Sequence, residues 1–296
     1  MSEFVIIADS TSDLTKDVRE KYDVDYVAMN YVIDGTEYVA SLDWETHSAK
    51  EFYDFMRNGK RATTTQVPRE AFISKFTHYL KEGKDVLYIS CSSALSGSVN
   101  LAKVIAAELA EEYKDNKVVC VDSLCSSLGQ GFMVIRASEL RKEGKSIDET
   151  AQYIEDNRLK VNQFCTVDNL DYLRRAGRVK ASSAFFGNMF GIKPIIISDI
   201  IGQNYAVEKV KGAGNAKAKI AQRVAEVVEE DGMDCLYITH ADCVEDAEAL
   251  RDKILELVPF KNVMMNNIGP IVGSCTGPGT VVAFCFGKEV TVKGSE

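Results

Sequence analysis

The chain has 296 residues, of which 46% are hydrophobic and 27% are charged, as in an ordinary globular protein. These proportions exclude a disordered chain, a collagen-like repeat and a small disulfide scaffold. The 44 acidic residues outnumber the 35 basic ones, so the net charge of −9 disfavours a broad binding surface for nucleic acid or anionic lipid.

The first half of the chain alternates between apolar strands and helices. Phe4–Ala8 has the pattern of a buried strand, and the cap-forming run Asp9–Asp13 predicts a helix over 14–22. Asp34-Gly35 predicts a β-hairpin, and 62–68 a polar loop whose proline suits the next helix. Further helices are predicted at 49–57, 68–81, 96–113, 126–141 and 147–158, and further strands at 24–32, 37–40, 86–90 and 118–121. This alternation indicates a parallel sheet that is covered on both faces.

The second half of the chain continues the alternation and predicts a second α/β domain. Helices are expected at 168–174, 215–230 and 244–257, and strands at 163–167, 193–197, 204–209, 235–239, 263–267 and 281–286. Since the length exceeds that of most single domains, we expect two α/β domains, 1–160 and 161–296.

Nothing in the sequence has the pattern of a membrane or export signal. The chain begins Met-Ser-Glu-Phe without a basic segment, and no apolar run approaches the roughly 20 residues that a membrane span needs. We therefore expect a cytoplasmic protein without stable membrane insertion, in which the eight cysteines are reduced thiols.

A serine-rich turn, Ser90–Ser98, separates a predicted strand from a long predicted helix. Ser96 is expected at the helix N-cap or in the first turn, where its hydroxyl and the N–H groups of Gly97 and Ser98 could hold an anion. Plain helix capping explains the same residues, because such turns are common.

Two other hydroxyl-rich segments precede predicted helices. Thr63–Thr65 offers neutral donors without a positive charge, and Asp9–Thr11 follows the first strand. If the three segments share one rim of a sheet, binding of a ligand there is favoured over simple capping.

The segment 268–279 is rich in glycine and proline, and is expected to be a rigid, tightly turning loop. Its Cys275 either faces a ligand or fills space. Arg174, Arg175 and Arg178 gather at a predicted helix end, as a docking site for an anionic partner or as a solvated terminus.

Several signatures of catalysis or cofactor binding are missing from the sequence. There is no phosphate-binding loop of the Gly-x-x-x-x-Gly-Lys-Ser type, and the spacing of Cys235, His240 and Cys243 is not that of a structural zinc site. The three histidines all lie outside the hydroxyl-rich segments, which weakens a hydrolase interpretation. We therefore predict no catalytic residue, no metal and no cofactor.

Seven segments taken together, in chain order, resemble the DegV family over nearly the whole chain. They are Asp9–Leu14, Thr64–Gln66, Ser92–Gly97, Asp122-Ser123 with Gly129–Gly131, Leu170–Arg178, Lys193-Pro194, and Gly269-Pro270 through Thr276–Gly279.

This resemblance implies two α/β domains with a long-chain fatty acid held between them. By motif position, the carboxylate would meet Thr64 and Ser96. Cys275 stands where the family usually has a histidine, and Thr65-Gln66-Val67 where Ser-Gln-Pro is usual. The remaining candidates for the ligand site are Gly97, Ser93, Thr65, Ser10 and Cys275.

Family members can act as the lipid-carrying subunit of a bacterial fatty acid kinase, in which a separate ATP-binding subunit phosphorylates the carboxylate. The leading hypothesis is therefore a non-catalytic fatty-acid-binding subunit. Burial of the tail would supply roughly 0.8 kcal/mol per CH₂, and uncharged donors would hold the head group. The alternatives are a thiol-dependent enzyme that uses Cys275 on a small acyl or carboxylate substrate, and a lipid-sensing binding module.

Overall fold

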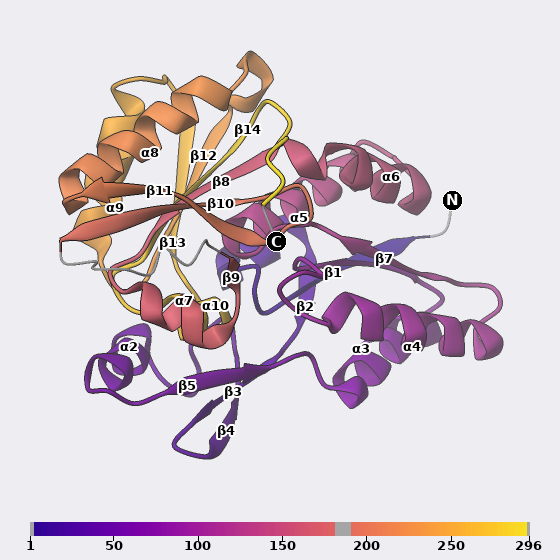
Figure 1. The fold of residues 1–296 in the computed structure, drawn as a ribbon. Helices are drawn as coiled ribbons and strands as arrows, with labels where there is room; N and C mark the ends of the chain where they lie inside the picture. The colour runs from indigo at the N-terminus through magenta and orange to yellow at the C-terminus, as the bar shows by residue number, and fades with distance from the viewer. Residues whose placement is uncertain (1–2, 181–190, 295–296) are drawn as a thin grey trace.

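The computed structural model describes residues 3–180 and 191–294, and the strands of these residues form three sheets (Figure 1). Sheet A has the strand order β2-β1-β6-β7, sheet B the order β4-β3-β5, and sheet C the order β13-β12-β14-β8-β10-β11-β9. Helices cover sheets A and C, so the predicted α/β class is confirmed.

Sheet A is the parallel sheet that the alternating pattern predicts. Its strands are β1 (Phe4–Asp9), β2 (Val24–Val27), β6 (Asp85–Ser90) and β7 (Val118–Asp122). Its helices are α1 (Lys16–Tyr22), α3 (Arg69–Lys81), α4 (Ser98–Glu112), α5 (Ser127–Lys142) and α6 (Ile147–Asn157). Helices α3 and α4 lie on one face of the sheet and α5 and α6 on the other (Figure 1), which explains why β6 is buried along its whole length.

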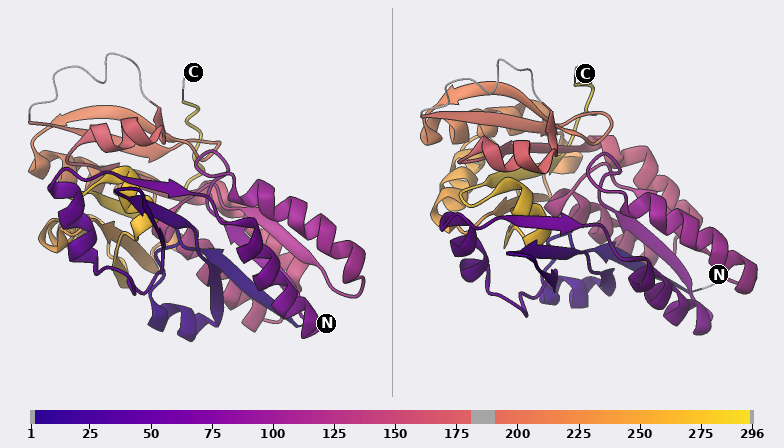
Figure 2. Two further views of the ribbon diagram at one scale, coloured as in Figure 1. Left: turned by 90° about the horizontal axis from the view of Figure 1, so that it is seen from below. Right: turned by 60° about the horizontal axis from the view of Figure 1, so that its bottom comes forward.

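Sheet B is a small antiparallel sheet of β3 (Asn30–Ile33), β4 (Thr36–Val39) and β5 (Ala62–Thr65). Helix α2 (Ala49–Arg57) connects β4 to β5 along the chain. The predicted hairpin at Asp34-Gly35 joins β3 to β4. The prediction of one strand over 24–32 is wrong, because β2 and β3 belong to different sheets. Figure 2 shows β3 and β5 lying beside the C-terminal half of the chain rather than beside sheet A.

The predicted loop at 62–68 is also wrong in its first half. Residues 62–65 form β5, in which Thr64 pairs with Tyr31 of β3. Threonine is β-branched and fits an extended, half-buried edge, so the run of three threonines is as suitable for a strand as for a loop.

Sheet C mixes parallel and antiparallel pairs. Its strands are β8 (Val161–Thr166), β9 (Val179–Lys180), β10 (Ile192–Ser198), β11 (Asn204–Lys211), β12 (Cys235–His240), β13 (Asn262–Asn267) and β14 (Val281–Phe286). Two helices, α8 (Ala213–Val227) and α9 (Val244–Leu255), pack against it. The proposed domain boundary falls directly before β8, and the division of the chain there remains a prediction.

Within the described ranges, no helix combines the length and the apolar character that crossing a membrane requires.

Helix α5 lies between sheets A and C and contacts strands of both, β1 and β6 on one side and β8, β12 and β14 on the other. Glycines make this close packing possible. A methyl group on Gly129 would come within 2.8 Å of the Phe284 ring, and one on Gly131 within 2.9 Å of the Ser12 carbonyl oxygen. The segment Gly129–Gly131 is therefore explained by the approach of the two sheets.

A buried carboxylate ties the two halves together beside this helix. Asp13 accepts hydrogen bonds from the Ser127 hydroxyl of α5 and, at 2.8 Å, from the Gly269 N–H of the C-terminal half. The Asn266 amide also donates to the Asp13 carbonyl at 2.9 Å. Burial raises the pKa of Asp13 from 3.8 to about 7, because the two hydrogen bonds only partly offset the loss of water.

We expect the pKa of Asp13 to make stability depend on pH. Between pH 3.8 and about 7 the folded protein holds a proton at Asp13 that the unfolded chain has released. The contribution of Asp13 to the free energy of unfolding should therefore fall as the pH rises through this range, by roughly 4 kcal/mol at about 1.4 kcal/mol per pH unit. Asp13→Asn should remove this slope. Urea unfolding of both proteins between about pH 5 and pH 8 measures it, and parallel pH profiles would contradict the prediction.

Candidate ligand-binding site

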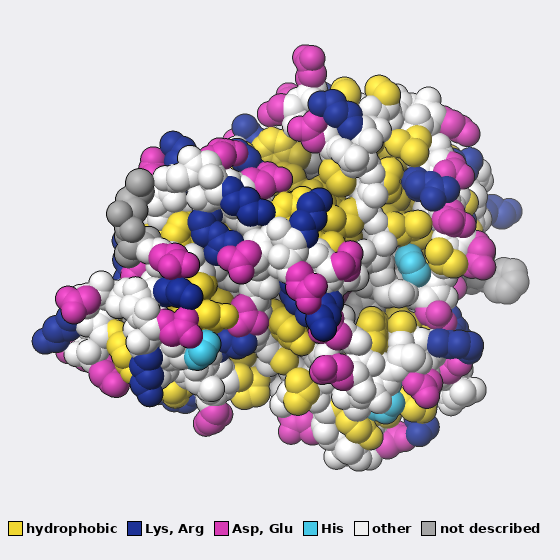
Figure 3. Space-filling view, turned by 180° about the vertical axis from the view of Figure 1, so that it is seen from behind, with side chains coloured by type: hydrophobic (Ala, Val, Ile, Leu, Met, Phe, Trp, Pro, Cys, Tyr) yellow, Lys and Arg dark blue, Asp and Glu magenta, His cyan; other side chains and the backbone are white. Residues whose placement is uncertain are grey.

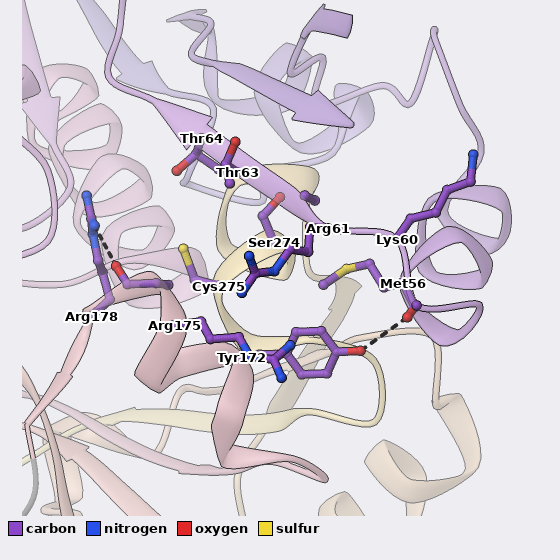
Figure 4. A pocket seen from close by; sticks show the side chains of 13 residues that line it. Met56, Lys60, Arg61, Thr63, Thr64, Tyr172, Arg175, Arg178, Ser274 and Cys275 are labelled. Carbon is purple, nitrogen blue, oxygen red and sulfur yellow. Dashed lines mark hydrogen bonds between the residues drawn. The ribbon is translucent and has the colours of Figure 1, made fainter. Parts of the chain in front are cut away.

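Two adjoining cavities lie between sheet B on one side and the helices α7 (Leu170–Ala176) and α10 (Pro270–Thr276) on the other. The hydroxyl cavity, of about 200 Å³, is lined by Thr11, Thr64, Thr65, Ser96, Ser126 and Thr276, together with apolar residues. The arginine cavity, of about 310 Å³, is lined by Arg61, Arg175 and Arg178 among others (Figure 4). Thr64, Arg178 and Cys275 line both, so the cavities meet at these three residues.

The carboxyl ends of β1 and β6 form one wall of the hydroxyl cavity. These strands are parallel neighbours, so the loops after them share one rim of sheet A, as predicted. The threonine segment reaches the cavity differently, since it belongs to β5 and not to a loop on that rim. Three hydroxyl-bearing residues from separate parts of the chain, Thr11, Thr64 and Ser96, thus line one space.

Helix α10 forms the opposite wall and corrects the prediction of a loop at 268–279. Pro270 occupies the first helical position, where its missing N–H costs nothing, and Gly277 ends the helix with a positive φ of 78°. A side chain at Gly277 would collide with the Tyr172 ring, so α10 and α7 approach closely at this point. The helix carries Cys275 and Thr276 to the cavity.

The structure brings together most of the residues that the sequence predicts for the ligand site. Thr64, Thr65, Ser96, Gly97 and Cys275 all line the hydroxyl cavity. Ser96 precedes the N-cap of α4, which is Gly97, so its expected position is wrong by one residue. Its hydroxyl accepts the Ser98 N–H at 3.3 Å.

Two predicted residues lie elsewhere. Ser10 is buried and its hydroxyl accepts the Met29 N–H at 2.9 Å, while Ser93 is exposed and its own N–H donates to the Asp122 carboxylate. Neither lines the hydroxyl cavity or the arginine cavity. The neighbour of Ser10, Thr11, lines the hydroxyl cavity, although the Thr11 hydroxyl is engaged in the interior by Gln130 Oε1 at 2.6 Å.

Sequence reasoning missed the apolar part of the hydroxyl cavity. Met29, Leu95, Leu173, Ile271 and Val272 line it, and they come from four separate parts of the chain. Leu173, Ile271 and Val272 lie in short helices, whereas Met29 and Leu95 lie in connecting segments, so no shared local pattern distinguishes them.

The predicted docking arginines divide between the cavity and the surface. Arg174 pairs with Asp171 at 3.0 Å on the exposed side of α7, whereas Arg175 and Arg178 line the arginine cavity. Arg178 donates to the Leu95 carbonyl at 3.1 Å and to the Ala176 carbonyl at 2.6 Å. The expectation of a purely uncharged head-group site is therefore incomplete, because the guanidinium of Arg178 lies at its edge.

The chemistry around Cys275 does not favour a reactive thiolate. Burial raises the pKa of this thiol, and the neighbouring Arg178 charge and Thr64 hydroxyl oppose that rise without reversing it. Of the described residues that line the two cavities, none is a histidine, so no imidazole stands ready as its base.

We expect Cys275 to react slowly with iodoacetamide at about pH 7, below the rate of an unperturbed thiol, because the protonated form is unreactive. Mass spectrometry of the alkylated peptide against time and pH gives the rate at this position, with Cys275→Ser to identify the peptide. Rapid modification at neutral pH would instead favour the thiol-dependent enzyme.

Known proteins are similar in sequence to almost the whole of this chain. The sequence profile of the DegV family, described as an uncharacterised protein family, matches residues 3–288. A DegV domain-containing protein of Clostridium perfringens is 37% identical over 287 residues, which cover 97% of this chain and 98% of that protein.

Solved structures of related proteins share the fold. A DegV family protein from Thermus thermophilus, described as binding fatty acid, superposes with a TM-score of 0.86 at 29% identity, covering 97% of this chain and 100% of that one. A DegV lipid-binding protein from Thermotoga maritima gives 0.85 at 25% identity, covering 98% and 100%.

Proposed function

Since the chain belongs to the DegV family, we propose that it binds a long-chain fatty acid in the hydroxyl cavity. One observation carries the proposal. Thr64 from β5 and Ser96 from the rim of sheet A line the same space, although 32 positions separate them in the sequence. These hydroxyls are the donors for the carboxylate, with the Arg178 guanidinium at the edge of the site.

The composition of the cavity fits an amphipathic acid. Met29, Leu173 and Ile271 offer apolar contact to a hydrocarbon tail, whose burial contributes roughly 0.8 kcal/mol per CH₂. A carboxylate in such surroundings needs hydrogen-bond donors, because burying it unpaired is very costly. Hydroxyl groups meet this need and leave one carboxylate oxygen accessible from the arginine cavity.

The finer proposal is that the protein presents this carboxylate to an ATP-dependent kinase subunit in the cytoplasm. It is supported by the junction of the two cavities at Thr64 and Cys275, where the head group would face the arginine cavity rather than the tail site. In this proposal the chain itself is not catalytic, needs no cofactor, and leaves ATP binding to its partner.

Lipid extraction and thermal unfolding test the binding proposal. Organic extracts of the purified protein should contain fatty acid, and palmitate should raise the melting temperature of the delipidated protein. Methyl palmitate is the matched control, because it has the tail without the charge. A protein that contains no fatty acid and gains no stability from palmitate would overturn the proposal.

A reconstituted reaction tests the kinase step separately. The palmitate-loaded protein, a cognate kinase subunit and ATP should give an acyl phosphate that hydroxylamine traps as the hydroxamate. Binding of palmitate without formation of the hydroxamate would favour the lipid-sensing module over the kinase subunit.

A further inference from the structure

The arginine cavity has a charge that the fatty acid alone does not require. Lys60, Arg61, Arg175 and Arg178 line it, and of the described residues in its lining none is acidic. The chain as a whole carries −9, and on the outer face in Figure 3 basic and acidic side chains are interspersed. The cavity therefore reverses the overall sign of charge locally, which favours an anionic occupant.

Two of these cations come from opposite walls of the cavity. Arg61 directly precedes β5, and Arg175 lies on α7. Figure 4 shows both side chains extending into the space between β5 and α7, beside Cys275. An anion between the two walls could contact both guanidinium groups, and it would adjoin Thr64, where the two cavities meet.

The guanidinium groups of Arg61 and Arg175 are only weakly engaged by the protein. The carboxylate of Asp171 lies 3.9 Å from Arg175 and pairs more closely with Arg174, at 3.0 Å. Arg61 forms no ion pair or hydrogen bond within the part of the chain that the structure describes. By contrast, Lys60 is paired with Asp34 at 2.7 Å. The planar forks of Arg61 and Arg175 thus remain available for an external oxyanion.

We propose that Arg61 and Arg175 form a subsite for a phosphoryl group, so that the protein also binds long-chain lipids whose head group is a phosphate. The inference rests on the proposed function, because the tail occupies the same apolar site. A phosphate bears more negative charge than a carboxylate and has three oxygens for bidentate arginine contacts. It extends beyond Thr64 into the arginine cavity, whereas a carboxylate ends at the hydroxyls.

Competition between two lipids with the same tail tests this subsite. We measure the affinities of hexadecyl phosphate and palmitate by calorimetry for the wild type and for the double variant Arg61→Gln, Arg175→Gln. The affinity for hexadecyl phosphate should fall about tenfold or more, and that for palmitate less than about threefold. The variant Arg61→Lys should bind hexadecyl phosphate with an affinity between those of the wild type and the double variant, since lysine retains the charge and lacks the planar guanidinium fork.

A matched control replaces Arg69 and Arg251 by glutamine, since these arginines line neither cavity, and it should leave both affinities unchanged. Equal losses for the two lipids in the Arg61, Arg175 variant would overturn the subsite, as would an unchanged affinity for hexadecyl phosphate. In either case retained palmitate binding by the wild type keeps the fatty acid proposal intact. A wild type that binds neither lipid overturns both.

Discussion

Replacing Thr64 by valine and Ser96 by alanine in one protein should lower its affinity for palmitate by about a hundredfold. Both side chains line the hydroxyl cavity, and Thr64 lies where it meets the arginine cavity. A hydrogen bond to a charged group is worth roughly 1.5 to 3 kcal/mol, and the partial exposure of both hydroxyls favours the lower end. Calorimetric titration of the delipidated proteins measures the difference.

The matched control is Thr36→Val with Ser93→Ala, which removes one exposed hydroxyl from sheet B and one from the same turn as Ser96. Neither residue lines the hydroxyl cavity or the arginine cavity, so the control should bind palmitate like the wild type. Hexadecanol, which has no carboxylate, should lose less affinity than palmitate in the Thr64, Ser96 variant. An unchanged palmitate affinity would remove both residues from the proposed site.

Asp9→Ala should reduce the free energy of unfolding by roughly 3 to 6 kcal/mol, because it leaves several buried donors without an acceptor. The fully buried carboxylate accepts from the Thr11 N–H at 3.0 Å, the Tyr88 hydroxyl at 2.9 Å and the Cys91 N–H at 3.1 Å. Each orphaned group costs roughly 1 to 3 kcal/mol. Since Thr11 and Cys91 line the hydroxyl cavity, its wall should loosen as well.

Urea unfolding measures this change, with two comparisons. Tyr88→Phe removes one donor and leaves the carboxylate with its other partners, so it should cost about 1 kcal/mol. Asp148→Ala breaks only the exposed pair with Lys117 and should cost less than about 1 kcal/mol. If Asp9→Ala were as stable as Asp148→Ala, the carboxylate would not hold this wall of the cavity.

Local sequence patterns predicted the fold best where a whole strand is buried. β1, β6 and β14 are short apolar runs between polar turns, and each is a buried strand. β5 was missed because its stability depends on pairing with β3, about thirty residues earlier, which no local pattern contains. The α10 segment carried its own signals, Pro270 at the first position and Gly277 at the end, but its density of glycine and proline favoured a loop.

The sequence predicted which residue types form the candidate site better than it predicted which way their side chains point. The motif resemblance singled out Thr64 and Ser96, which do line one cavity. The hydroxyl-rich segment Asp9–Thr11 also suggested Ser10, whose hydroxyl instead accepts the Met29 N–H, because residue type alone does not say which way a side chain points. Arg61 has no local signal, since its position facing Arg175 arises only when β5 and α7 come together.

The placement of α5 between sheets A and C has a consequence for how a lipid reaches its site. Moving sheets A and C apart would expose apolar side chains on one side of α5 to water. The free-energy cost of this motion grows with each side chain that is exposed. The wall made by sheet B and α2 is also held to the C-terminal half, because α10 packs against β3, β5 and α2 and the buried Tyr53 hydroxyl donates to the Ile268 carbonyl at 2.7 Å. We therefore expect loading and release to proceed without separation of sheets A and C, because α5 keeps the two sheets in fixed register.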